Sequence, residues 1–367
     1  MQAMSFTDRW LPVWILLAMA LGLALGRLIP GLDTALESVS IAGVSLPIAV
    51  GLLVMMYPVL AKVRYDETRR IAADPRLMGT SLVLNWVVGP ALMFALAWLL
   101  LPDLPEYRTG LIIVGLARCI AMVLIWNDLA CGDREAAAVL VAINSVFQVI
   151  AFGALGWFYL QVLPAWLGLE TTSAEFSFWT IVTSVLVFLG IPLLAGVGSR
   201  LLGEKIKGRD WYENTYLPKI SPLALVGLLY TIVLLFSLQG EQIAANPWTV
   251  ARLAVPLVIY FLGMFSIALI AAKMAGLSYA QSASVSFTAA GNNFELAIAV
   301  AIGTFGAASG QALAGTIGPL IEVPVLVGLV YVMLRLGPVL FAGDPTLPHT
   351  PADDDRPTNN RKDRVTS

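Results

Sequence analysis

The chain has 367 residues, of which 58% are hydrophobic and 13% are charged, and its formal net charge is -2 at pH 7. Soluble domains are about 45–50% apolar and about 25% charged, so the composition excludes an ordinary soluble protein. We expect the lipid bilayer to surround the chain and expect no nucleic-acid partner. Two cysteines also exclude a disulfide scaffold.

Ten apolar runs, each near the twenty residues that cross a hydrocarbon core, follow one another between short polar loops. They cover residues 11–30, 46–63, 77–101, 110–131, 135–163, 176–202, 219–238, 250–273, 279–307 and 312–341. The first run is long, lacks a clean small-residue cleavage site and is followed by further runs, so we expect a helix and not a signal peptide. The sequence predicts an all-α polytopic membrane protein with ten transmembrane helices.

The basic residues predict the orientation of the chain. Arg and Lys cluster between the second and third runs, between the sixth and seventh runs, and in the tail, whereas the alternate loops carry only Arg27, Arg108 and Arg252. Basic loops face the cytoplasm. We therefore expect a multi-pass protein of the cell membrane, the inner membrane of a bacterium, with a cytoplasmic N-terminus (1–10) and a cytoplasmic, disordered, proline-rich tail (342–367).

The ten runs divide into two halves of similar length. Residues 11–163 and 176–341 hold five runs each, and an external linker of residues 164–175 joins them. Five crossings per half give the halves opposite orientations, which is the inverted-repeat plan of many secondary transporters. Weak sequence echoes between the halves align Gln148 with Glu322 and place Arg118–Cys119 opposite Asn292–Asn293.

The candidate charges at membrane depth are Arg118, Asp128, Glu295 and Glu322. A charge at the centre of a spanning helix costs about 2.5–3.5 kcal/mol on insertion scales, so each charge needs a partner or a water-filled cavity. Asp128 lies near the cytoplasmic end of its run, and we expect it to reach the interface. Arg118, Glu295 and Glu322 lie deeper. We expect one glutamate to pair with Arg118 and the other to titrate.

Two of the runs contain residues that favour local unwinding. Gly291 is followed by Asn292 and Asn293, whose side chains bond readily to backbone, and the fourth run has Gly115 three residues before Arg118. Unwound backbone at membrane depth is tolerated where it lines a cavity or is buried in protein. Discontinuous fourth and ninth helices in opposed repeats indicate a substrate site at mid-membrane; the alternative is that the glycines only permit close helix packing.

Cys119 also admits two interpretations. A buried cysteine in an apolar helix is usually inert core, whereas contact with Arg118 favours the thiolate. Cys131 cannot chelate a metal with it, because twelve residues span roughly 18 Å of helix. We expect no metal site and no cofactor. A single soft sulfur is suited to a weak, reversible contact with a thiophilic solute.

Three stretches carry a family resemblance. They are "GTSLVLNWVVGPALMFALAW", "GLARCIAMVLIWNDLACGD" and "GNNFELAIAVAIGTFGAASGQALAGTIGPLIEVPVLVGLV", beginning at residues 79, 115 and 291. They resemble the arsenite efflux permeases, the arsenical-resistance permease family of the bile acid/arsenite/riboflavin transporter superfamily. The resemblance covers nearly the whole chain except the tail.

The resemblance implies ten helices in two inverted repeats and efflux of trivalent arsenite, in some members also antimonite, driven by the proton gradient. It maps the essential cysteine onto Cys119 and the conserved glutamate of the ninth helix onto Glu295. We expect substrate to contact Cys119 and the polar groups around it, and Glu295 to take up a proton, with Glu322 as the second candidate. The expected substrate and supporting residues are Arg118, Asn292, Asn293, Asn144, Gln148, Gly115 and Gly291.

Three rival functions remain open at this point. A sodium-coupled organic-anion carrier of the same superfamily is the nearest, and a passive channel for neutral hydroxides is another. An intramembrane hydrolase is disfavoured, because no run contains a histidine to act as base and no His-Glu-x-x-His motif is present. We therefore expect no enzyme.

Overall fold

The computed structural model describes residues 10–29, 31–32, 36, 40–41, 44–63, 74–120, 122–171, 178–245 and 247–348. Residues 1–9 of the expected cytoplasmic N-terminus lie outside the described residues. So do residues 172–175 of the expected external linker and residues 349–367 of the expected tail. Arg64, Arg69 and Arg70 of the first basic cluster also lie outside them.

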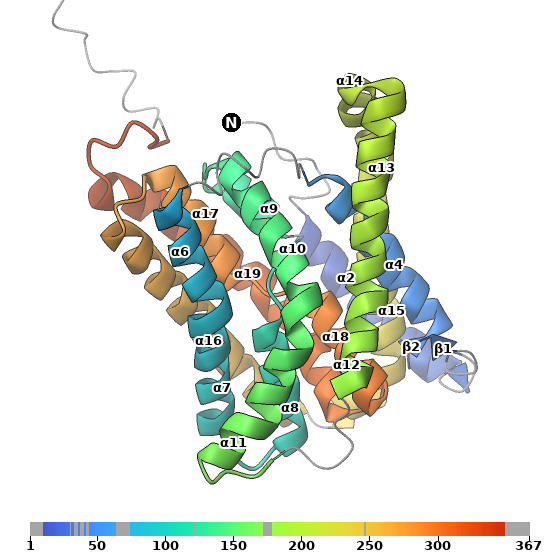
Figure 1. Ribbon diagram of the computed structural model, residues 1–367. Helices are drawn as coiled ribbons and strands as arrows, with labels where there is room; N and C mark the ends of the chain where they lie inside the picture. Colours follow the sequence, from blue (N-terminus) through green and yellow to red (C-terminus); the bar gives the residue numbers. More distant parts are fainter. Residues whose placement is uncertain are drawn as a thin grey trace, which may run out of the picture.

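The first half of the described chain is almost entirely helical (Figure 1). Its helices are α2 (Leu11–Leu28), α4 (Leu46–Ala61), α6 (Pro75–Val83), η1 (Leu84–Val88), α7 (Gly89–Leu100), α8 (Pro105–Leu116), α9 (Val123–Leu129), α10 (Arg134–Trp157), η2 (Phe158–Val162) and α11 (Leu163–Trp166). The all-α expectation needs one small correction. Strands β1 (Ser40–Ile41) and β2 (Val44–Ser45) pair antiparallel just before α4, where β-branched side chains favour extended backbone.

The second half continues in the same way. Its helices are α12 (Phe178–Val185), η3 (Leu186–Gly190), α13 (Ile191–Lys207), α14 (Arg209–Trp211), η4 (Tyr212–Tyr216), α15 (Leu217–Ala245), α16 (Pro247–Met274), α17 (Tyr279–Ala290), α18 (Phe294–Phe305) and α19 (Gly310–Leu340). Each apolar run predicted from the sequence therefore corresponds to a helix, to helices joined end to end, or to a pair of helices separated by a break.

The four η elements are single π-helical turns, and a proline explains each of them. Pro90, Pro164, Pro192 and Pro218 each stand at the second position of the α-helix that follows a π turn. A proline has no N–H to bond the carbonyl four residues earlier, and its ring clashes with that carbonyl. A π turn, which bonds five residues apart, widens the helix at this point and removes the conflict.

The helices have the length and composition of membrane spans. Six described helical stretches are long and apolar enough to cross a bilayer: Pro75–Leu100, Arg134–Trp166, Phe178–Lys207, Arg209–Leu238, Pro247–Met274 and Gly310–Leu340. Large apolar side chains in the middle of helices point outward, such as Ile150 and Leu194, which are about three-quarters exposed. Lipid is the environment in which such exposure carries no cost. The chain is a polytopic membrane protein.

The helices pack in two groups. In the first, α15 lies against α2 and α4, and α13 lies against α4. In the second, α16 packs against α7, α17 and α19, while α8 packs against α7 and α19. Figure 1 shows α4, α13 and α15 on one side of the molecule and α6, α7 and α16 on the other. Helix α18 lies between them and packs against α19, α12 and α8.

Candidate functional site

The first helix break separates α8 from α9. Helix α8 ends at Leu116, and Ala117 is extended with φ -86° and ψ 109°. Helix α9 begins at Val123. Arg118 and Cys119 therefore lie in irregular backbone, and the break predicted at Gly115–Arg118 is present. Neighbouring side chains on a regular helix point about 100° apart, and the irregular backbone here removes that constraint on Arg118 and Cys119.

The second break separates α17 from α18. Helix α17 ends at Ala290, and Gly291 is extended with φ -73° and ψ 152°. The side chain of Asn293 then caps α18 by accepting a hydrogen bond from the N–H of Leu296 at 3.1 Å. Asparagine is a preferred cap because its short side chain reaches the free N–H groups of the first turn. The Gly-Asn-Asn sequence thus ends one helix and starts the next.

The two breaks cross and bond to each other. Arg118 and Asn292 form an isolated antiparallel β-bridge, and the N–H of Asn293 donates to the carbonyl of Ala117 at 3.0 Å. The Asn292 amide Nδ2 donates to the carbonyls of Val114 at 2.8 Å and Ala117 at 3.2 Å. Buried backbone groups must be paired, and each broken helix supplies partners for the other.

A side chain from a neighbouring helix holds each break. Gln148 on α10 accepts a hydrogen bond from the N–H of Arg118 at 2.9 Å and donates to the Arg118 carbonyl at 3.0 Å. Glu322 on α19 accepts one from the N–H of Asn292 at 3.1 Å. Gln148 also donates to the carbonyl of Asn144 at 3.3 Å. The residues aligned in the two halves of the sequence therefore make matching contacts.

The Arg118 side chain is fully buried, with 0% exposure. Its guanidinium donates to the hydroxyl of Tyr260 at 2.9 Å and to the carbonyl of Ala289 at 3.4 Å. A further short hydrogen bond runs from Nη2 to the carbonyl of Gly115. Tyr260 was not singled out in the sequence, because nothing distinguishes it from other aromatic residues of an apolar run.

The ion pair expected between Arg118 and a glutamate is absent from the described residues. No carboxylate of this part of the chain lies within the 4.0 Å of an ion pair from the guanidinium. The physical reason is that carbonyls at the ends of two helices, which carry partial negative charge, take the place of the carboxylate. Asp128, in contrast, is 42% exposed and lies 3.6 Å from Arg134, as expected of a residue at the interface.

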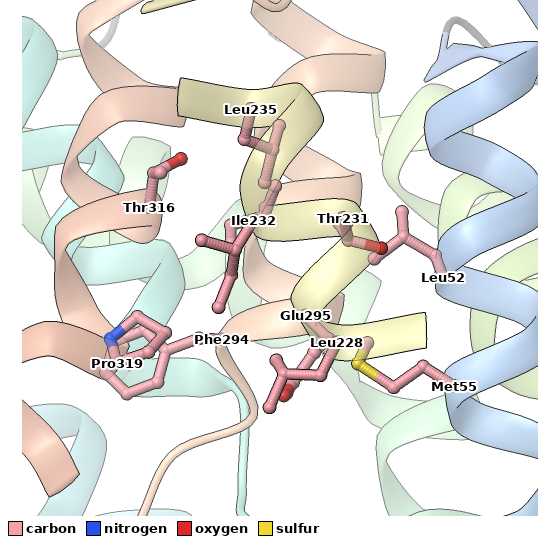
Figure 2. Close-up of a pocket in the computed structure, with 11 residues that line it drawn as sticks. Leu52, Met55, Leu228, Thr231, Ile232, Leu235, Phe294, Glu295, Thr316 and Pro319 are labelled. Atoms are coloured by element: carbon pink, nitrogen blue, oxygen red, sulfur yellow. The ribbon is translucent and has the colours of Figure 1, made fainter. Parts of the chain in front are cut away.

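A pocket lies between the two groups of helices, and Glu295 is the charged residue that lines it (Figure 2). Apolar side chains from α4, α15, α18 and α19 form most of its wall. Thr231 and Thr316 add two hydroxyls, which donate to carbonyls of their own helices at 2.7 Å and 2.9 Å. The pocket encloses about 310 Å³, including open solvent at its mouth. Glu295 is therefore the carboxylate that borders this small, mostly apolar space.

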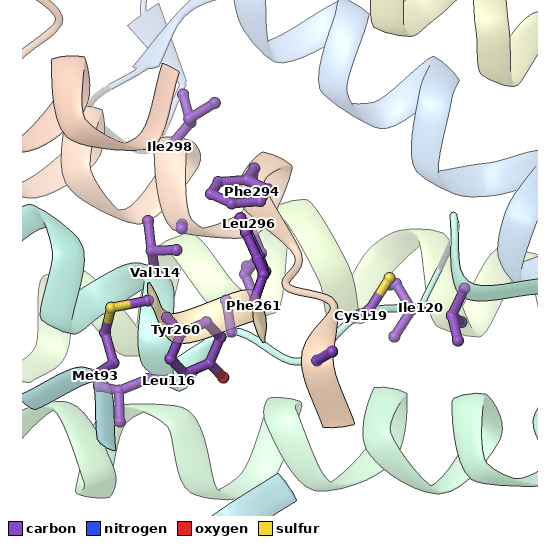
Figure 3. Packing of buried hydrophobic residues seen from close by; sticks show 14 of the residues in the cluster. Met93, Val114, Leu116, Cys119, Ile120, Tyr260, Phe261, Phe294, Leu296 and Ile298 are labelled. Atoms are coloured by element: carbon purple, nitrogen blue, oxygen red, sulfur yellow. The ribbon is translucent and has the colours of Figure 1, made fainter. Parts of the chain in front are cut away.

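Cys119 is 1% exposed and lies next to the irregular segment after α17 (Figure 3). A Cβ atom at position 291 would lie 3.2 Å from the Cys119 sulfur and 3.2 Å from a Glu322 carboxylate oxygen. The cysteine and the glutamate thus pack against the same glycine. Cys119 does not line the pocket, so the structure places the expected sulfur ligand and Glu295 in adjacent regions and not on one surface.

Three buried amide groups at the crossing have atoms without a hydrogen-bond partner among the described residues. They are Asn144 Nδ2, Asn292 Oδ1 and Asn293 Nδ2. A buried polar atom left unpaired costs about 1–3 kcal/mol.

Comparison with known proteins decides the family. The model of the sodium bile acid symporter family matches residues 49–246. The arsenical-resistance protein Acr3 of Corynebacterium glutamicum is 76% identical over 344 residues, which cover 94% of this chain and 93% of that protein. The chain belongs to the Acr3 arsenical-resistance family.

More distant relatives match over a similar length. Acr3 of Alkaliphilus metalliredigens is 33% identical over 344 residues, covering 91% of this chain and 94% of that protein. An uncharacterised transporter of Synechocystis is 38% identical over 346 residues, covering 89% and 88%. The resemblance seen in the sequence motifs is therefore confirmed across the helical part of the chain.

Proposed function

We propose that this protein is a secondary active transporter that exports trivalent arsenite from the cytoplasm in exchange for protons. The observation that carries the proposal is the 76% identity to a protein named for arsenical resistance. The buried site adds chemical support, since it combines a soft sulfur with amide groups and carboxylates.

The chemistry of arsenite suits this set of groups. Arsenous acid is neutral near pH 7, its three hydroxyls donate and accept hydrogen bonds, and its arsenic is thiophilic. The unpaired Asn292 Oδ1 and Asn293 Nδ2 offer one acceptor and one donor, and the Cys119 sulfur offers a soft ligand. One sulfur gives a weak, reversible contact, which a carrier needs in order to release its solute.

Proton coupling is assigned first to Glu295. It lines the pocket between the two helix groups, whereas Glu322 is 3% exposed and bonds to backbone. Substrate entering from the cytoplasm contacts Cys119, Asn292 and Asn293, and it leaves outside as Glu295 takes up a proton. Glu322 remains the second candidate for the proton carrier.

The proposal includes ten crossings in two inverted five-helix repeats, residues 11–163 and 176–341, with both termini cytoplasmic. The matching contacts support it. Gln148 bonds to Arg118, and Glu322 bonds to Asn292, at the same separation of thirty residues. The bridge between Arg118 and Asn292 is antiparallel, as two inverted segments require.

Transport into everted membrane vesicles tests the function. Wild-type vesicles are expected to accumulate arsenite when acidified inside, and to stop when a protonophore is added. Cys119→Ser is expected to lose arsenite uptake while keeping its folding, and Glu295→Gln is expected to lose the dependence on the proton gradient. Full proton-driven uptake by both variants would refute these roles, and uptake that survives the protonophore would indicate a passive channel.

A sodium-coupled organic-anion carrier is the second candidate, favoured by the match to the sodium bile acid symporter family. Uptake driven by a sodium gradient and unaffected by pH would favour this candidate.

A further inference from the structure

Two helix C-termini meet at the Arg118 guanidinium. Gly115 is in the last turn of α8, and Ala289 is in the last turn of α17. The last four carbonyls of a helix have no partner inside it. The N–H of Asn293, which would serve Ala289 in a continuous helix, donates to Ala117 instead. Both carbonyls bond to the guanidinium.

The positive charge of the Arg118 guanidinium is offset here without a carboxylate. A helix C-terminus carries about half a negative charge, so two of them offset about one positive charge. The third oxygen, the hydroxyl of Tyr260 on α16, is also neutral. Three neutral oxygens from three helices are the kind of ligand set that broken transport helices offer to a cation.

The fit to arginine itself is incomplete. Arg118 Nε is buried and has no hydrogen-bond partner among the described residues, although arginine has five N–H donors. The three oxygens therefore accept hydrogen bonds from the two Nη groups of Arg118 and leave its Nε without an acceptor. A site built only to cap two helices with arginine would be expected to satisfy this donor as well.

We propose that the Gly115 and Ala289 carbonyls and the Tyr260 hydroxyl form a monovalent-cation site that the side chain of Arg118 fills as a tethered cation. With this cation in place, the crossing needs no dissolved metal ion. Removing the side chain opens the site to a small free cation, either guanidinium or Na⁺. The inference concerns the same site as the proposed function but does not depend on the substrate.

Thermal unfolding of the purified full-length chain in detergent tests the site without arsenite. Arg118→Ala is expected to unfold below wild type in choline chloride. About 10 mM guanidinium or sodium chloride, at matched ionic strength, is expected to raise its Tm by about 2–4 °C. Arg108→Ala is the control, because Arg108 is also buried but bonds to Pro102 and stacks on Trp98. Wild type and Arg108→Ala are expected to show no such rise.

Two results would overturn the proposal. One is a Tm of Arg118→Ala that no cation raises above its value in choline; the other is an equal rise in all three proteins. If Arg118→Ala does not fold, Arg118→Lys and Arg118→Met decide the question. The lysine variant, which keeps the charge, is expected to be the more stable, and a methionine variant of equal or greater stability would contradict a cation site.

Transport separates this inference from the proposed function. In everted vesicles, arsenite uptake by Arg118→Ala is expected to become dependent on guanidinium or Na⁺. If wild type carries no arsenite, the proposed function fails and the unfolding test still stands. If wild type carries arsenite and no cation affects either the Tm or the uptake of Arg118→Ala, only the cation site fails.

Discussion

Glu322 accepts a hydrogen bond from the backbone N–H of Asn292 at 3.1 Å, and the two residues are thirty positions apart in the sequence. Gln148 makes the same bond to Arg118 at the same separation, at 2.9 Å. The first of these side chains is an acid and the second is a neutral amide. The contact itself therefore requires a hydrogen-bond acceptor and not a charge.

The first prediction follows from this comparison. Glu322→Gln is expected to keep both its folding and proton-driven arsenite uptake, because glutamine supplies the same acceptor. Glu322→Leu has the same approximate size and no acceptor, and it leaves a buried N–H unpaired at a cost of about 1–3 kcal/mol. Uptake measured against pH checks this. A glutamine variant that has lost its pH dependence would make Glu322 the proton carrier.

The second prediction concerns Gly291. A Cβ at this position would lie 3.0 Å from the Cβ of Cys119 and 3.2 Å from Glu322. Gly291→Ala is expected to push both side chains apart, to lower the stability by about 1–3 kcal/mol, and to reduce arsenite uptake. Gly79→Ala in α6 is the control, because nothing lies within 4 Å of its Cβ. Equal activity of both variants would show that the close packing is unimportant.

The third prediction tests the pocket. Ile232 lines it and is 6% exposed, whereas Val226 on the same helix is 58% exposed. Ile232→Trp is expected to fill the pocket, to separate Glu295 from water and to slow proton-driven uptake at least tenfold, about 1.4 kcal/mol. Val226→Trp adds a similar bulk at the lipid and is expected to leave uptake near wild type. Comparable rates in the two variants would exclude the pocket from the proton path.

The fourth prediction is a pH dependence outside the membrane. The hydrogen bond from Arg252 lowers the pKa of Asp103 from 3.8 to about 2. A lowered pKa means that the folded state favours the carboxylate, so its stabilising effect is present above about pH 4 and is lost as the pH falls toward 2. The Tm difference between wild type and Asp103→Asn is expected to shrink across this window. A difference that stays constant down to pH 2 would contradict the assignment.

The helices could be predicted well from the sequence because lipid imposes a simple rule. Apolar runs near twenty residues long fix where helices lie, and the run at 77–101 became α6, η1 and α7 over 75–100. The breaks were also predictable, since Gly291 with two asparagines is a poor helix interior. The π turns were not predicted, although a proline at a fixed position marks each of them.

The partner of Arg118 is the part of the site that the sequence did not reveal. The sequence indicates that a buried cation needs compensation, and the two nearby glutamates are the obvious candidates. The compensating negative partial charge comes instead from the backbone carbonyls of Gly115 and Ala289. Every helix C-terminus has such carbonyls, so no residue type in the sequence marks them. Tyr260 was missed for a related reason, since only its position in three dimensions makes it a ligand.

The π turn η3 divides one helical stretch into two parts, α12 and α13, that pack against different helices. Below it, α12 packs against α10 and α18; beyond it, α13 packs against α4. One extra residue rotates every later side chain by about 100° around the axis. A single helical stretch therefore presents one set of side chains to α10 and α18 and, beyond η3, a set rotated around the axis to α4.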